Sequence, residues 1–224
     1  MPIKIQDSLP AQKILENENI FVMTEHRAMH QDIRPLRVLI LNLMPTKIVT
    51  ETQLLRKLSN TPLQIEVEFL KTASYIPQHT DPTHLDTFYT TFDEIKERRY
   101  DGMIITGAPL DYIEFEDVTY WNEVCRIMDW CKSHVHCTLH LCWAAFAGLH
   151  YYYGIPKVDY EKKLSGVYEH TVVKKNSPFF RGFDDVFYAP QSRAMGMRRE
   201  DIEAIDELEL MAISEEAGVT IVKT

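Results

Sequence analysis

The sequence lacks an excess of positive charge, a cysteine framework and any apolar run near the ~18 residues that a membrane span needs. Its 224 residues carry 24 Lys+Arg against 33 Asp+Glu, a net charge of −9, so binding to nucleic acid is disfavoured. The first residues lack a charged segment followed by an apolar one, and we expect neither secretion nor membrane insertion. Cys125, Cys131, Cys137 and Cys142 form no Cys-x-x-Cys pair, so reduced thiols in a cytoplasmic protein are expected.

A short run of metal-ligand residue types does not predict a metal site. His134, His136, Cys137 and His140 crowd into one strand-like segment. Because side chains alternate between the two faces of a strand, these groups cannot converge on one ion.

Apolar runs and helical spacing alternate along the chain. The pattern predicts strands at 37–45, 63–70, 102–106 and 135–141, and helices at 46–60, 85–99, 124–131 and 143–147. This order predicts an α/β fold, a doubly wound, mostly parallel, flavodoxin-like sheet whose ligands bind beyond the carboxyl ends of the strands. Strand-rich segments at 165–173, 186–189 and 209–213 predict added mixed or antiparallel strands. No repeat or linker divides the chain, so we expect a single domain over residues 1–224.

Cys142 lies where a predicted buried strand stops and a helix begins, the position of a nucleophile elbow. A helix N-terminus favours the thiolate, and the N–H of Trp143 would point towards an oxyanion. The alternative is a buried structural cysteine. The other three cysteines are predicted to lie in the core. His140 is about 6.6 Å along the strand from Cys142, too far to act as its base, and is predicted to pack within the sheet.

Two loops supply further candidates. Gly107 follows a strand at the same end of the sheet, and its backbone could approach a ligand and give a second oxyanion donor. The alternative is an ordinary strand-to-helix turn. The segment Pro190–Arg193 follows a predicted strand and offers a hydroxyl and a guanidinium, which could together bind a carboxylate. The alternative is a surface loop.

Five segments, in order along the chain, carry a more specific signal. They are residues 21–35, Leu41–Lys47, Thr106–Pro109, Leu141–Trp143 and Phe183–Pro190. Together they resemble the homoserine O-acyltransferases built on the class I glutamine-amidotransferase-like fold, over essentially the whole chain.

The resemblance implies a ping-pong mechanism, in which a thiolate takes an acyl group from acyl-CoA and the amino acid's hydroxyl then attacks the thioester. Cys142 matches the acyl-carrying cysteine, and Lys163 and Ser192 match residues that contact the amino-acid substrate. Asp111 falls where the family selects the donor, and its charge would repel a succinyl carboxylate, so acetyl-CoA is expected. Lys47 is a further candidate at the strand ends. The resemblance implies no cofactor besides acetyl-CoA as co-substrate, and a homodimer.

Several positions depart from the family's pattern. Ala144, Phe146 and Gln191 stand where the family usually carries glycine, glutamine and histidine, so L-serine is an alternative acceptor to L-homoserine. Residues 219–224 resemble a strand cut off where the family continues, and the family's catalytic histidine and glutamate lie beyond it. Succinyl-CoA as donor, a cysteine hydrolase or amidotransferase, and a truncated non-catalytic relative therefore stay as alternatives.

Overall fold

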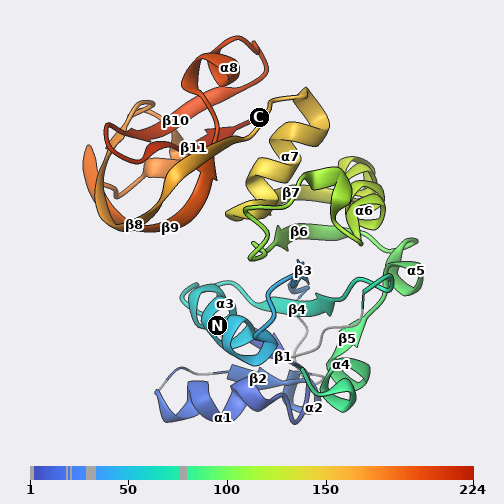
Figure 1. The fold of residues 1–224 in the computed structure, drawn as a ribbon. Coiled ribbons are helices and arrows are strands. Elements are labelled where there is room, and N and C mark those ends of the chain that lie inside the picture. Colours follow the sequence, from blue (N-terminus) through green and yellow to red (C-terminus); the bar gives the residue numbers. More distant parts are fainter. Residues whose placement is uncertain (1–2, 19, 21, 29–33, 76–79) are drawn as a thin grey trace. The chain divides into compact units, whose positions relative to one another are not determined.

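The computed structural model describes residues 3–18, 20, 22–28, 34–75 and 80–224, which form two compact units. The first comprises residues 1–109 and 115–145, and the second comprises residues 110–114 and 146–224. Residues 21 and 29–33, part of the first segment that carries the family resemblance, lie outside the described residues. Figure 1 shows a sheet in each unit, built from β1 to β7 and from β8 to β11 respectively.

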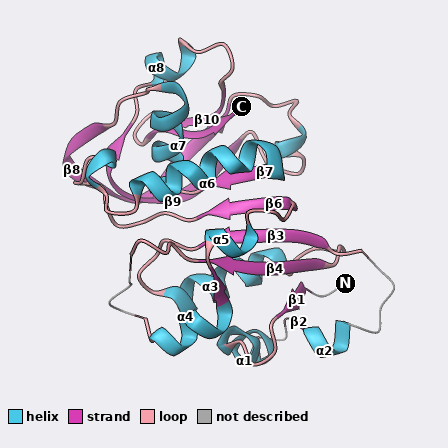
Figure 2. Ribbon diagram, turned by 90° about the vertical axis from the view of Figure 1, so that its right-hand side faces the viewer, coloured by secondary structure: helices cyan, strands magenta, loops and turns pink. Residues whose placement is uncertain are grey.

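The first unit contains a parallel sheet of seven strands. They are β1 (Ile3–Ile5), β2 (Val22–Thr24), β3 (Leu36–Leu41), β4 (Ile65–Leu70), β5 (Tyr89–Thr90), β6 (Tyr100–Ile105) and β7 (Val135–His140). The order is β2-β1-β4-β3-β6-β7, with β5 paired to β4, and β4, β6 and β7 visibly run in one direction (Figure 2). Leu39, Ile40 and Leu41 are all buried, because a central strand is covered on both faces. The predicted α/β class and its mostly parallel sheet are confirmed.

Helices connect these strands. They are α1 (Pro10–Asn17), α2 (Glu25–Ala28), α3 (Lys47–Leu58), α4 (Pro82–Phe88), α5 (Phe92–Ile95), the 3₁₀ turn η1 (Phe115–Asp117), α6 (Trp121–His134) and α7 (Trp143–Tyr153). The predicted face of α6 is buried, with Val124, Ile127 and Met128 at most 1% exposed. None of the helices in the described part of the chain is long and apolar enough to cross a membrane.

The single helix predicted at 85–99 is wrong. Tyr89 and Thr90 instead pair with β4, and a capping box between Thr91 and Glu94 starts a new helix, α5. Leu85 and Ile95 are buried as their spacing suggested, but they belong to two short helices. The helical spacing of apolar residues continues through this segment, but strand pairing and the capping box interrupt the helix there.

The second unit contains an antiparallel sheet, which confirms the predicted added strands. Its strands are β8 (Val158–Val172), β9 (Val186–Gly196), β10 (Glu209–Ser214) and β11 (Gly218–Lys223), in the order β11-β10-β8-β9. The 3₁₀ turn η2 (Pro178–Phe180) and helix α8 (Arg199–Glu203) lie between them in sequence. Val172, Phe180, Met211 and Ala212 form a small buried core.

Candidate active site

Cys142 lies in a strained turn between β7 and α7. Its φ of 52° is left-handed, a conformation that a residue with a side chain adopts only at a cost. Leu141 donates its N–H to Ile105 O at 2.9 Å, and the N–H groups of Ala144 and Ala145 bond back to Leu141 O and Cys142 O at 3.1 and 2.9 Å. The turn is thus fixed on both sides of Cys142, whose side chain is exposed. This is the geometry by which a nucleophile elbow presents its side chain.

Gly107 lies against this turn. The loop that carries it follows β6, whose Ile105 is paired with His140 of β7. A Cβ built on Gly107 would stand 3.0 Å from Cys142 Cβ and 3.6 Å from its Sγ, closer to Cβ than side chains normally come. A side chain at this position would force Cys142 to shift by a few tenths of an ångström, so glycine favours this approach of the backbone to the thiol.

Trp143 is the first residue of α7, so its N–H has no acceptor within the helix. Its indole is fully buried, with ring centroids 5.9 Å from Phe115 and 6.4 Å from Tyr120. This packing fixes the backbone of the residue that follows the thiol. Gly107 packs against Cys142 and Trp143 follows it directly in sequence, so their N–H groups are the candidate oxyanion donors.

The other thiols differ from Cys142. Burial raises the pKa of Cys125 to about 11, with Asp129 and Glu116 adding to the shift, and burial raises the pKa of Cys131 to about 12. Both are core residues, as predicted. The prediction that Cys137 is buried is wrong, because it is exposed on β7, the edge strand of its sheet.

His140 lies at the end of β7. Its Nδ1 is 3.3 Å from Ala144 O, and burial lowers its pKa. The imidazole is therefore bound to the backbone of the first turn of α7 and favours the neutral form. Among the described residues, no three His, Cys, Asp or Glu side chains gather as a metal site would require.

Sequence reasoning named Lys47 but missed the buried polar cluster on and beside α3 to which it belongs. Lys47 is 5% exposed and donates to Asn42 O, and Glu51, 0% exposed, accepts from Tyr89 Oη at 2.5 Å and lies 2.9 Å from His84 Nε2. Burial lowers the pKa of Lys47 to about 8, while the charge of Glu51 opposes that shift. A lysine and a glutamate on a helix ordinarily indicate a solvated face, so the sequence gives little signal of this cluster.

Asp111 belongs to the loop of residues 110–114 in the second unit. Its Oδ2 accepts the N–H of Ala194 on β9 at 2.8 Å. The side chain of Lys157, 6% exposed, reaches the same loop and lies 3.3 Å from Asp111 O and 3.0 Å from Glu114 Oε1. The carboxylate that the sequence singled out is thus held by the second unit's sheet.

Lys163 and Ser192 lie on neighbouring strands of the second unit. Ser165 on β8 pairs with Ser192 on β9, and Lys163 stands two residues earlier, in the irregular stretch between Asp159 and Leu164. Both candidate side chains are exposed. The structure therefore brings these two candidates to adjacent positions of one sheet.

Arg193 does not join Ser192 as a carboxylate-binding pair, which corrects the sequence prediction. Its guanidinium is buried and donates to Ala217 O and, at 3.3 Å, to Val219 O. It also lies 5.4 Å from the ring centroid of Phe146. Strand alternation explains the difference, because consecutive residues of β9 face opposite sides.

Comparisons with known proteins agree with this geometry. The family model described as "HTS: Homoserine O-succinyltransferase" matches residues 2–224. The chain is 56% identical over its whole length to a homoserine O-acetyltransferase of Acetivibrio thermocellus, and 58% identical to one of Clostridium botulinum, covering 73% of each. A solved glutamine amidotransferase from Thermotoga maritima gives a TM-score of 0.55 at 14% identity, covering 85% of this chain and 72% of that one.

The structural likeness, at this low identity, concerns the fold alone and confirms the expected glutamine-amidotransferase-like architecture. The sequence matches extend over the whole chain and confirm the resemblance drawn from the five segments. The chain belongs to the homoserine O-succinyltransferase family.

Proposed function

We propose that the protein is a homoserine O-acetyltransferase of methionine biosynthesis, which transfers acetyl from acetyl-CoA to L-homoserine through a thioester on Cys142. The observation that carries the role of Cys142 is its left-handed backbone at the strand-to-helix turn, against which Gly107 packs so closely that a Cβ on it would crowd Cys142. The high identity to relatives named homoserine O-acetyltransferase supports the reaction.

In the first step the Cys142 thiolate attacks the carbonyl carbon of acetyl-CoA. The carbon–sulfur bond to CoA then breaks, and CoA leaves as its thiol, taking up the proton that Cys142 lost when it ionised. During the attack the carbonyl oxygen becomes an oxyanion, and in this proposal the N–H groups of Gly107 and Trp143 stabilise it. Such donors act strongly because they are fixed before charge develops.

In the second step the hydroxyl oxygen of homoserine attacks the carbonyl carbon of the thioester, and the bond from that carbon to Cys142 Sγ breaks. O-acetylhomoserine is released, and the proton lost by the hydroxyl restores the thiol of Cys142. Lys163 supplies an ammonium for the α-carboxylate of the amino acid, and Ser192 supplies a hydroxyl that orients it. Their neighbouring places on β8 and β9 support a common role in binding.

Asp111 selects the donor in this proposal. The family's description names succinyl transfer, whereas the relatives above are named for acetyl transfer. A fixed carboxylate repels the distal carboxylate of a succinyl group and leaves an acetyl group unaffected. Acetyl-CoA is therefore the expected donor, with no cofactor beyond this co-substrate.

Mass spectrometry of the intact protein tests nucleophile and donor together. Acetyl-CoA should add an acetyl group to the wild type but not to Cys142→Ala, and homoserine should remove it. A succinyl adduct alone would refute the role of Asp111, and clearance by serine rather than homoserine would change the acceptor. Hydrolysis of glutamine without acyl-enzyme formation would instead indicate an amidotransferase.

The proposal also covers domain organisation, oligomeric state and location in the cell. We assign both compact units to one acyltransferase domain, active as a homodimer in the cytoplasm. All four cysteines are free thiols, which suits a reducing compartment. Light scattering of the purified protein measures the oligomeric state.

A further inference from the structure

We infer that Lys157 is a positioning residue for donor selection, which holds the loop of residues 110–114 so that the Asp111 carboxylate stays fixed and free of an ion pair. The inference rests on the proposed role of Asp111 and adds a residue that neither the sequence motifs nor the reaction identified. Lys157 acts through the loop and does not itself touch the reacting atoms.

Lys157 is surrounded by oxygen atoms. Its Nζ lies 3.3 Å from Asp111 O and 3.4 Å from Ile113 O, both main-chain carbonyls of the loop. It also forms ion pairs with Glu114 at 3.0 Å and Asp159 at 3.4 Å. One buried ammonium thereby ties three of the five loop residues to the start of β8.

The distribution of charge leaves the Asp111 carboxylate available. The positive charge of Lys157 is matched by Glu114 and Asp159, and only the main-chain oxygen of Asp111 faces it. The carboxylate is anchored by the uncharged N–H of Ala194 on Oδ2, and no hydrogen bond to Oδ1 is made by a described residue. The Asp111 carboxylate is thus held in place by a neutral donor, and no described residue forms an ion pair with it.

Fixing the loop matters because a repulsive charge discriminates between donors only while it stays near the acyl group that it repels. A free Asp111 side chain could rotate into water and accommodate a succinyl carboxylate at little cost. The side chain of Lys157 is 6% exposed, and a buried lysine of this kind is retained only where partners compensate its lost hydration. Its loss would leave two loop carbonyls and two carboxylates without their common partner.

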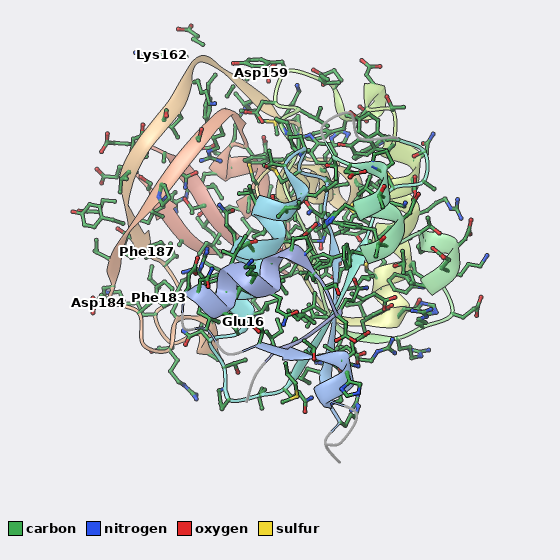
Figure 3. The ribbon with its side chains drawn as sticks, turned by 90° about the horizontal axis from the view of Figure 1, so that it is seen from below. Glu16, Asp159, Lys162, Phe183, Asp184 and Phe187 are labelled. Carbon is green, nitrogen blue, oxygen red and sulfur yellow. The ribbon has the colours of Figure 1, made fainter. Side chains whose placement is uncertain are left out.

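Lys157→Met tests the inference in a competition assay. Acetyl-CoA, succinyl-CoA and homoserine are mixed in one sample, and mass spectrometry quantifies the acetylated and succinylated products. Since both donors meet the same enzyme, the product ratio does not depend on how much of a variant is folded. Lys162→Met is the matched control, because Lys162 is exposed and projects outward from β8, the strand that begins directly after Lys157 (Figure 3). We expect the acetyl-to-succinyl ratio to fall roughly three- to tenfold in Lys157→Met, and to stay at the wild-type value in Lys162→Met.

Asp111→Asn separates this inference from the donor role itself. If Lys157 acts through Asp111, the double variant should give the same ratio as Asp111→Asn alone. An unchanged ratio in Lys157→Met, or a further fall in the double variant, would overturn the inference while the donor role survives. An unchanged ratio in Asp111→Asn would overturn the donor role. Should Lys157→Met be insoluble, Glu114→Gln removes one ion pair at an exposed side chain and should lower the ratio in the same direction.

Discussion

Gly107 faces Cys142 with little room for a side chain between them: a Cβ there would stand 3.0 Å from Cys142 Cβ and 3.4 Å from Leu141 O. The loops after β6 and β7 are held in this relation by their strands, since Leu141 donates its N–H to Ile105 O and Thr106 donates its own to Leu41 O. The thiol and the backbone of a neighbouring loop are thereby brought together by the sheet itself.

Gly107→Ala should reduce acylation of Cys142 by about 100-fold or more, the loss typical of a displaced oxyanion donor. Gly102→Ala is the matched control on β6, because a Cβ there would meet Val38 and Cys137 O at the ordinary distances of 3.7 and 3.8 Å. Single-turnover acylation followed by mass spectrometry measures both variants. Equal acylation rates in the two variants would show that Gly107 has no part in the chemistry.

The left-handed backbone of Cys142 should affect the free energy of unfolding of variants at this position. Glycine adopts positive φ freely, whereas alanine does not, so Cys142→Gly should be more stable than Cys142→Ala by about 1 kcal/mol. At an ordinary helical position the order would be reversed by a similar amount. Urea unfolding of the two inactive variants gives the difference directly, and a more stable alanine variant would contradict the strained turn.

The elements that the sequence predicted are those whose signal is local. The apolar run through Leu39 and Leu41 and the helical spacing of Val124 to Cys131 depend on burial of one segment, and both were found as expected. The turn at Cys142 could be predicted because a strand pattern ends and a helix pattern begins at this residue. Lys157 could not be found in this way, because its loop partners lie more than 40 residues away in sequence and only the fold brings them together.

Stability should rise with pH above about 8 because of Lys47. Burial lowers its pKa to about 8, while an unfolded lysine keeps ~10.4, so between these values the unfolded chain binds more protons than the folded one. The cost of burying the ammonium is fully present below pH 8 and is relieved as pH rises. Wild type should therefore gain about 1 to 2 kcal/mol relative to Lys47→Met between pH 7.5 and about 9.5.

Denaturant unfolding of both proteins across this range provides the measurement. Cys125 and Cys131, whose pKa values are raised by burial, pull the stability of each protein the opposite way at high pH. Their effect is shared by wild type and variant, so the difference between the two curves isolates Lys47. Parallel curves would show that the Lys47 ammonium is not buried at a cost.

Thiol labelling should separate the four cysteines into two pairs. Cys137 and Cys142 are exposed and should react with iodoacetamide, whereas Cys125 and Cys131 are buried with pKa values of about 11 and 12, so at pH 7.5 they hold almost no thiolate. Acetyl-CoA should protect Cys142, because the acyl group occupies its sulfur, and should leave Cys137 reactive. Peptide mapping by mass spectrometry reports each site separately, which makes Cys137 an internal control in every sample. Protection of both thiols would indicate a general effect of acetyl-CoA on the protein, and protection of neither would contradict the acyl-enzyme.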